Sequence, residues 1–116
     1  MEFIKAMEAL GVNVTITLER FAQNESLWKR FVLKFIDDPT YESLSKAVGA
    51  ESYMDIERDA HTLKGTSANL GFQRLSDICA QLVDCVRRKE YHEISEIWGL
   101  MKKEYEELID GISVFL

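Results

Sequence analysis

One histidine of this sequence stands in a pattern that suits chemistry. His61 is followed by Lys64 at the third position and by Gly65 at the fourth. On an α-helix, residues three and four apart lie on one face. A helix here would present an imidazole, an ammonium group and bare backbone side by side. The second histidine, His92, has no such neighbours and is interpreted as a surface residue.

These three residue types together suit a carrier of an anionic group. Neutral imidazole is a nucleophile near pH 7, and it also leaves readily from phosphorus, so a phosphoryl group can be handed onward. Lys64 would offset part of the added negative charge. A glycine inside a helix costs about 1 kcal/mol relative to alanine. On the outer face of a helix, packing gives no reason for a glycine at position 65. We therefore interpret Gly65 as a residue that leaves open space beside the His61 ring.

The sequence around His61 lacks the parts that would make phosphohistidine from ATP. There is no Gly-rich phosphate loop and no acidic magnesium cluster near it. We therefore predict a phosphocarrier that is not an enzyme and has no cofactor or metal of its own. Magnesium and the catalytic carboxylates are expected on the partner protein.

Helical periodicity predicts an all-α fold for the whole chain, as a single domain over residues 1–116. We expect an antiparallel four-helix bundle over about residues 25–114, with one or two short N-terminal helices, about residues 2–22, packed against it. Asp38 is predicted to cap a helix that has Pro39 at its first position. The first helix of the bundle is expected to open at Asn24 or Ser26 and to stop at Asp37-Asp38-Pro39. The helices expected after it are about 39–48, 52–70, 73–89 and 91–113.

The helix that carries His61 is predicted to begin at Ser52 and to end at Gly71. Ser52 and Asp55 are spaced as in a capping box. At about 100° per residue, His61 lies about 140° from the centre of the apolar seam and should face solvent. The seam, whose members alternate at spacings of four and three, consists of Ile56, Ala60, Leu63, Ser67 and Leu70.

Charge and composition exclude several classes of protein. The net charge is −6, which argues against a nucleic-acid surface. No apolar run approaches the roughly 18 residues of a membrane span, and the first residues do not resemble a signal peptide. Cys79 and Cys85 would lie about 9 Å apart along one helix, beyond disulfide reach. Free buried thiols fit a reducing compartment, so we expect a cytoplasmic protein. Nothing in the sequence demands a dimer, so a monomer is expected and the oligomeric state stays open.

The run His61-Thr62-Leu63-Lys64-Gly65, completed by Leu70-Gly71, resembles the signature of histidine-containing phosphotransfer (HPt) domains, H-x-L-K-G-x-x-x-x-L-G. The likeness extends over most of the chain, to a free-standing single-domain protein of this family. It implies a four-helix bundle with an exposed phosphoacceptor histidine. It also implies exchange of phosphoryl groups with response-regulator receiver domains and a hybrid histidine kinase, in a multistep phosphorelay of two-component signal transduction.

The resemblance implies a role for each residue of the motif. His61 would be the phosphorylated residue, Lys64 would neutralise the phosphoryl group, and Gly65 would give the partner access. Several members of the family also place a glutamine on the following helix, where this sequence has Val83. Gln81 and Asp84 are the alternatives for that contact.

Other residues are candidates for contacts with the imidazole or with a docking partner. Glu57, four residues before His61, could hold the imidazole by a hydrogen bond or be a solvated acid. Met54, Ala68 and Phe72 are candidates for an apolar docking surface. Phe3 and Met7 are further candidates. Core packing is the alternative for Phe72, Phe3 and Met7, and packing is an equal alternative for Met54. The cations that could steer an acidic partner are Arg58, Arg74 and residues 87–89.

Two other functions fit parts of the pattern. A binding module that docks on or sequesters a receiver domain without phosphotransfer would share the fold and the surface. A helical structural protein would explain the seams, but not an exposed glycine beside Lys64 inside a helix. A phosphotransfer protein with His61 as its acceptor explains both the apolar seams and the exposed glycine.

Overall fold

Residues 2–116, which the computed structural model describes, are almost entirely helical, and the predicted all-α class is confirmed. The elements are α1 (Phe3–Ala9), α2 (Val14–Arg20), α3 (Glu25–Phe35), α4 (Thr40–Gly49), α5 (Tyr53–Leu70), α6 (Gln73–Arg87), a 3-10 turn η1 (Tyr91–Glu93) and α7 (Ile94–Ser113).

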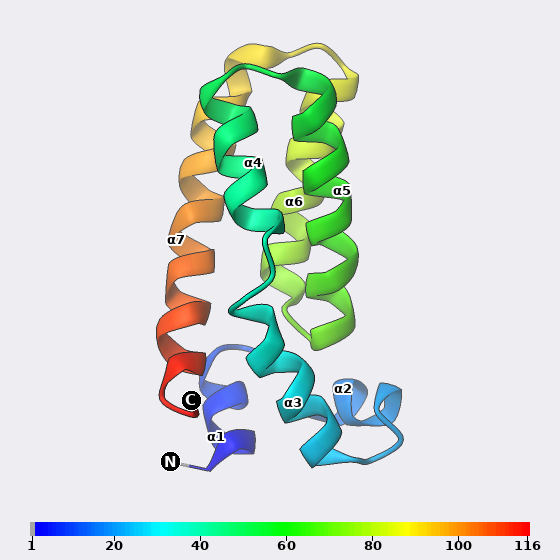
Figure 1. The fold of residues 1–116 in the computed structure, drawn as a ribbon. Coiled ribbons are helices and arrows are strands. Elements are labelled where there is room, and N and C mark those ends of the chain that lie inside the picture. The colour runs from blue at the N-terminus through cyan, green and yellow to red at the C-terminus, as the bar shows by residue number, and fades with distance from the viewer. Residues whose placement is uncertain (1) are drawn as a thin grey trace.

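Helices α4 to α7 form an antiparallel bundle, with α3 continuing the column of α4 and α1 and α2 at its lower end (Figure 1). Both ends of the chain lie at this lower end. Between α3 and α4 the Asp38 carboxylate accepts a hydrogen bond from the Thr40 backbone N–H at 2.8 Å. Pro39 is the N-cap of α4, one residue before its predicted place. The predicted bundle with short N-terminal helices is confirmed.

The core forms along the seam that the periodicity indicated. Every seam position of α5 is buried, including the two small residues, Ala60 and Ser67. Small side chains let α6 pack closely along α5. Cys79 and Cys85 are buried free thiols on α6, as predicted.

Residues from outside the bundle hold the lower end of α5. Gly71 ends the helix with a positive φ of 93°, and the Phe72 N–H donates to the Ser67 carbonyl at 2.8 Å. The Trp28 indole N–H donates to the Leu70 carbonyl at 3.0 Å. These bonds satisfy carbonyls that a helix leaves without partners at its C-terminus.

The predicted capping box at the upper end of α5 is wrong in detail. The Ser52 hydroxyl donates to the Asp55 carboxylate at 2.8 Å, and neither side chain accepts a bond from the backbone N–H that the motif requires. Asp55 is instead drawn into an ion pair with Arg58 at 3.0 Å.

Gly71→Ala should unfold the lower end of α5. An added Cβ would lie 2.5 Å from the Thr17 hydroxyl oxygen and 2.8 Å from a Val12 methyl carbon, on a residue with positive φ. Strain and overlap together should lower the free energy of unfolding by about 2–4 kcal/mol. Urea unfolding followed by circular dichroism measures this loss. If the free energy of unfolding fell by less than about 0.5 kcal/mol, the segment with Val12 and Thr17 would be able to move aside for the added methyl group without strain, and the prediction would be wrong.

Tyr41 joins α4 to α7 and should make the fold sensitive to alkali. Its ring stacks on Tyr105 with centroids 3.6 Å apart. Burial, followed by the nearby Glu106 carboxylate, raises the pKa of Tyr41 to about 12. The neutral phenol is therefore favoured in the fold, and this contribution is complete below about pH 10 and lost between about pH 10 and 12. Tyr41→Phe should move the alkaline unfolding midpoint upward, and an unchanged midpoint would contradict the assignment.

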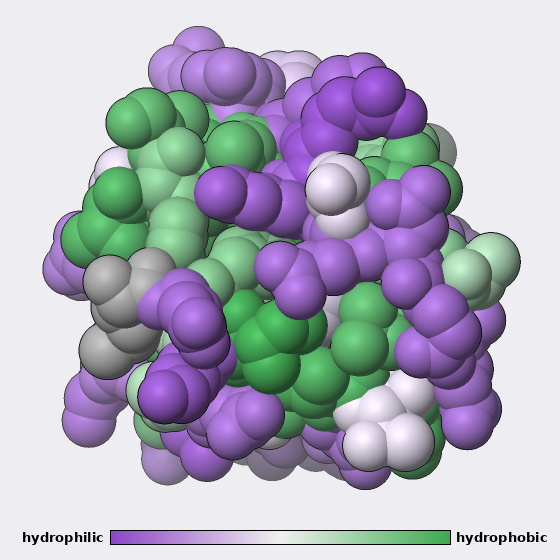
Figure 2. Space-filling model, turned by 90° about the horizontal axis from the view of Figure 1, so that it is seen from below, coloured by the Kyte–Doolittle hydropathy of each residue, from purple (hydrophilic) through white to green (hydrophobic). Residues whose placement is uncertain are grey.

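Apolar side chains are visible between polar ones at the end formed by α1 to α3 (Figure 2). Phe31 of α3 and Ile16 of α2 are among the exposed large apolar residues. Among residues 2–116, no helix combines the length and the apolar character needed to cross a membrane.

Candidate functional site

His61 lies in the middle of α5, on the side that faces away from the core. Its side chain is exposed, while Ala60 and Leu63 beside it in sequence are buried. The structure gives the imidazole no hydrogen bond or ion pair with any residue of the range 2–116. The rotational position predicted from the seam is confirmed.

Gly65 provides the open space expected beside the imidazole. It is exposed, and a Cβ built on it would meet no described heavy atom within 4 Å. Its backbone has ordinary helical geometry, without the positive φ that requires glycine at Gly71. Packing and backbone conformation therefore do not explain why glycine occupies this position.

Lys64 lies on the edge of α5 that faces α6. The Ser76 hydroxyl of α6 donates to the Lys64 carbonyl at 3.0 Å, which ties the two helices at this turn. Burial raises the pKa of the Cys79 thiol to about 12, and the positive charge of Lys64 opposes that rise, so the ammonium is near this part of α6. Lys64 has no ion-pair partner within residues 2–116, which leaves its charge available to an anion.

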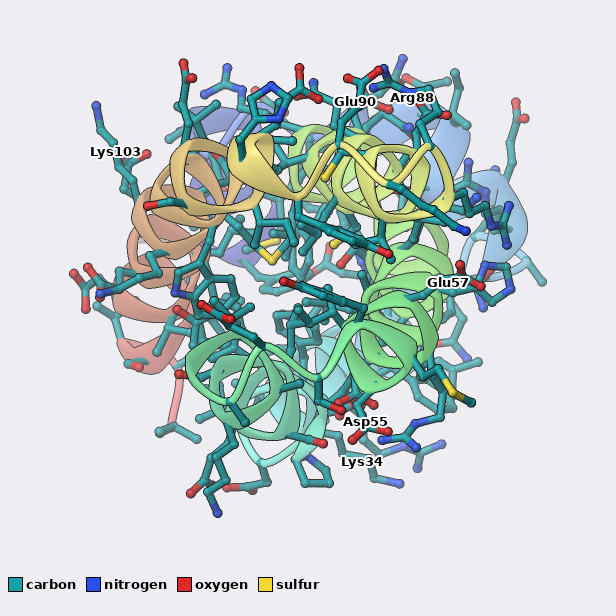
Figure 3. All side chains as sticks on the ribbon, turned by 90° about the horizontal axis from the view of Figure 1, so that it is seen from above. Lys34, Asp55, Glu57, Arg88, Glu90 and Lys103 are labelled. Atoms are coloured by element: carbon teal, nitrogen blue, oxygen red, sulfur yellow. The ribbon has the colours of Figure 1, made fainter. Side chains whose placement is uncertain are left out.

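Glu57, one turn before His61, is paired with a cation from α6. Its carboxylate lies 3.6 Å from the Arg87 Nε, and the two side chains are 40% and 59% exposed. Figure 3 shows Glu57 on the outer side of α5, separate from Arg88 and Glu90. Of the two alternatives for Glu57, a hydrogen bond accepted from the imidazole is absent among the described contacts, and the carboxylate is a partly exposed acid that Arg87 engages. Exposed ion pairs of this kind contribute about 0–1 kcal/mol.

Gln81 and Asp84 were alternatives for a contact with His61, and both placements are wrong. The two side chains line a groove with Ile97 and Leu100 of α7, on another side of α6. Asp84 accepts a hydrogen bond from the Arg88 Nε at 2.9 Å. The α6 positions that face α5 are those of Ser76, Cys79, Val83 and Arg87.

The candidate docking residues divide between surface and core. Met54 is 87% exposed and Ala68 is half-buried. They are seven residues before and after His61, so all three lie on one face of α5. Phe72, Phe3 and Met7 are buried in the core, so core packing, the alternative to docking, is confirmed for all three. Phe72 packs against the Phe35 ring, with centroids 5.4 Å apart.

Two residues near the site escaped prediction from sequence. The Arg20 guanidinium of α2 donates to the Ala68 carbonyl at 2.6 Å, although 48 residues separate them. In the sequence Arg87 stands only as part of a basic run, and no local spacing indicates that it pairs with Glu57. Such contacts depend on how helices are aligned with one another. Among residues 2–116, no three His, Cys, Asp or Glu side chains gather as metal ligands.

Comparison with known proteins agrees with this geometry. A family model described as Hpt domain matches residues 38–111, which include α4 to α6 and most of α7. The chain belongs to the Hpt domain family. Domains of this family are phosphocarriers of two-component phosphorelays and are generally not enzymes.

The chain is also similar to a curated protein, Syntaxin PEP12 of Saccharomyces cerevisiae. The two are 32% identical over 81 residues, which are 69% of this chain and 27% of that protein. The chain thus spans about a quarter of the length of this relative, too little to show a second family. No solved structure gives a significant match.

Proposed function

We propose that this protein is a phosphorelay intermediate in which His61 carries the phosphoryl group. The observation that carries the proposal is an unpartnered imidazole between Lys64 and the open space at Gly65, within a chain that belongs to the Hpt domain family. An exposed ring with cleared space suits a nucleophile that must enter another protein's active site.

The proposed step is an exchange between two proteins. A ring nitrogen of neutral His61 attacks the phosphorus of a receiver-domain phosphoaspartate, the P–O bond breaks, and the aspartate carboxylate leaves. The reverse step on a second receiver domain passes the group onward. Magnesium and the acidic residues belong to the receiver domain, and Lys64 offsets charge on the transferred group.

Docking would use the face of α5 on which His61 lies. Met54 and Ala68 border the imidazole, and the exposed thioether of Met54 is suited to an apolar contact. Lys64 and Arg87 flank the same face and favour an acidic partner surface. The free-standing, cytoplasmic and monomeric state remains part of this proposal.

The test is phosphoryl transfer from a panel of labelled receiver domains and from a hybrid kinase. We expect label on this protein that is stable to alkali and lost in acid, as for a phosphoramidate bond. Label that is stable to acid but lost in alkali would contradict a phosphohistidine. Tight receiver binding without any labelling would instead support the binding module.

A further inference from the structure

Two cations lie on the α6 side of α5, one on each side of His61 along the helix. Lys64 is three residues after the histidine, and Arg87 reaches Glu57, four residues before it. Both lie on the α6 side of His61, since Ser76 bonds the Lys64 carbonyl and Arg87 itself belongs to α6. A phosphoryl group on His61 would sit between these two positive charges.

We infer that Arg87 is a second phosphoryl-binding cation, which Glu57 holds while His61 is unmodified. The inference rests on the proposed phosphorylation of His61. When the group arrives, Arg87 would exchange the carboxylate of Glu57 for the phosphoryl oxygens. When the group leaves, the ion pair would form again.

Charge and geometry favour this exchange. Glu57 carries one negative charge, and its carboxylate lies 3.6 Å from the Arg87 Nε, a long contact for an ion pair. A phosphoryl group carries a charge of about −1.5 to −2 at pH 7 and three acceptor oxygens. A guanidinium binds such oxygens in pairs, which a single long carboxylate contact does not match.

The distance that Arg87 must cover is short. Residues four apart on a helix have Cβ atoms about 5–6 Å apart. Glu57 and His61 are so spaced, and Arg87 is 59% exposed and not packed into the core. Arg58, three residues before His61, is less available because it contacts both Asp55 and Asp59, at 3.0 and 3.2 Å.

Val83, the α6 position one turn before Arg87, makes a second cation useful. Val83 is buried and apolar, so this turn of α6 offers no polar side chain to a phosphoryl group. Arg87, one turn further along α6, is the α6 side chain on this edge with donors able to fill that role.

The experiment measures the lifetime of phosphohistidine in the full chain, labelled with phosphoramidate, a small donor that needs no docking. Phosphorus NMR follows first-order loss of the group. A bound guanidinium disfavours the protonation that precedes cleavage of the N–P bond. Arg87→Gln should therefore shorten the half-life about three- to tenfold, as expected for one lost hydrogen-bonding partner.

Glu57→Gln should act in the opposite direction, because it frees Arg87. We expect a half-life about twofold longer than that of the unaltered protein, a modest effect since the ion pair it removes is weak. The double variant should behave like Arg87→Gln, because Glu57 acts only through Arg87. Arg87→Lys should restore part of the lifetime.

A purely structural bridge predicts a different pattern. Removing either partner breaks the same α5–α6 contact, so Glu57→Gln and Arg87→Gln would then change the half-life alike, or not at all, and the inference would be overturned. Arg88→Gln is the matched control for charge, since Arg88 pairs with Asp84 and Glu90 elsewhere and should leave the half-life unchanged. Failure of phosphoramidate and of every receiver domain to label His61 would overturn the proposed function as well.

Discussion

Replacing His61 with glutamine should abolish phosphoryl labelling of the protein and leave its fold unchanged. The imidazole is exposed and has no described partner, so its loss should alter the free energy of unfolding by less than about 0.5 kcal/mol. Glutamine keeps a polar side chain of similar reach but has no nucleophilic ring nitrogen. Label transferred from a phosphorylated receiver domain should fall to background.

Two controls make this experiment specific. His92→Gln removes the other histidine, which is also exposed and lies in η1, and should keep full labelling. Circular dichroism and thermal unfolding of His61→Gln should match the unaltered protein. Label persisting on His61→Gln at the unaltered level would mean that a different residue accepts the group, and the proposed function would then be wrong.

Which side of α5 faces the core could be predicted from the sequence, because the spacing of apolar residues within this one helix is sufficient to decide it. Five seam positions at spacings of four and three fix the buried side, and the structure buries all five. The exposure of His61 follows from helical geometry alone. The open space at Gly65 follows as well, since residues on one face share one environment.

Contacts between helices could not be predicted in the same way. The pairing of Glu57 with Arg87 depends on the alignment of α5 against α6, which no local spacing encodes. The same limit explains why Gln81 and Asp84 were placed wrongly: both are polar and near the right position in sequence, but they lie on the side of α6 that faces α7. Polar character alone does not say which side of a buried helix a residue occupies.

The apolar residues show a related limit. Phe72 follows Gly71 directly and was a plausible surface residue, yet the reversal of the chain at Gly71 turns it into the core against Phe35. Met54 has the same apolar character and stays exposed, because it lies on the His61 face of α5. For single apolar residues near a turn, the path of the backbone decides burial.

Substitutions of Gly65 should separate stability from phosphotransfer. Gly65→Ala should raise the free energy of unfolding by about 1 kcal/mol, because the helix interior prefers alanine and the added methyl meets open space. Gly65→Gln should also be tolerated by the fold. Its side chain would, however, fill the space beside His61 and slow transfer from a receiver domain by about 100-fold or more.

The chain offers a matched control in α7. Gly99 is also exposed inside a helix, and an added Cβ there would likewise meet no described atom within 4 Å. Gly99→Ala should give a similar gain in stability, measured by urea unfolding, with no loss of transfer. Transfer at unaltered rates in Gly65→Gln would show that the space is not used.

The size dependence of the Gly65 series identifies what the glycine does. If open space is the requirement, transfer should fall moderately in Gly65→Ala and steeply in Gly65→Gln, while labelling by phosphoramidate falls much less. If backbone freedom were the requirement, both substitutions should slow transfer alike, since either removes it. A residue whose replacement stabilises the fold and impairs transfer in proportion to side-chain size is retained for access to His61.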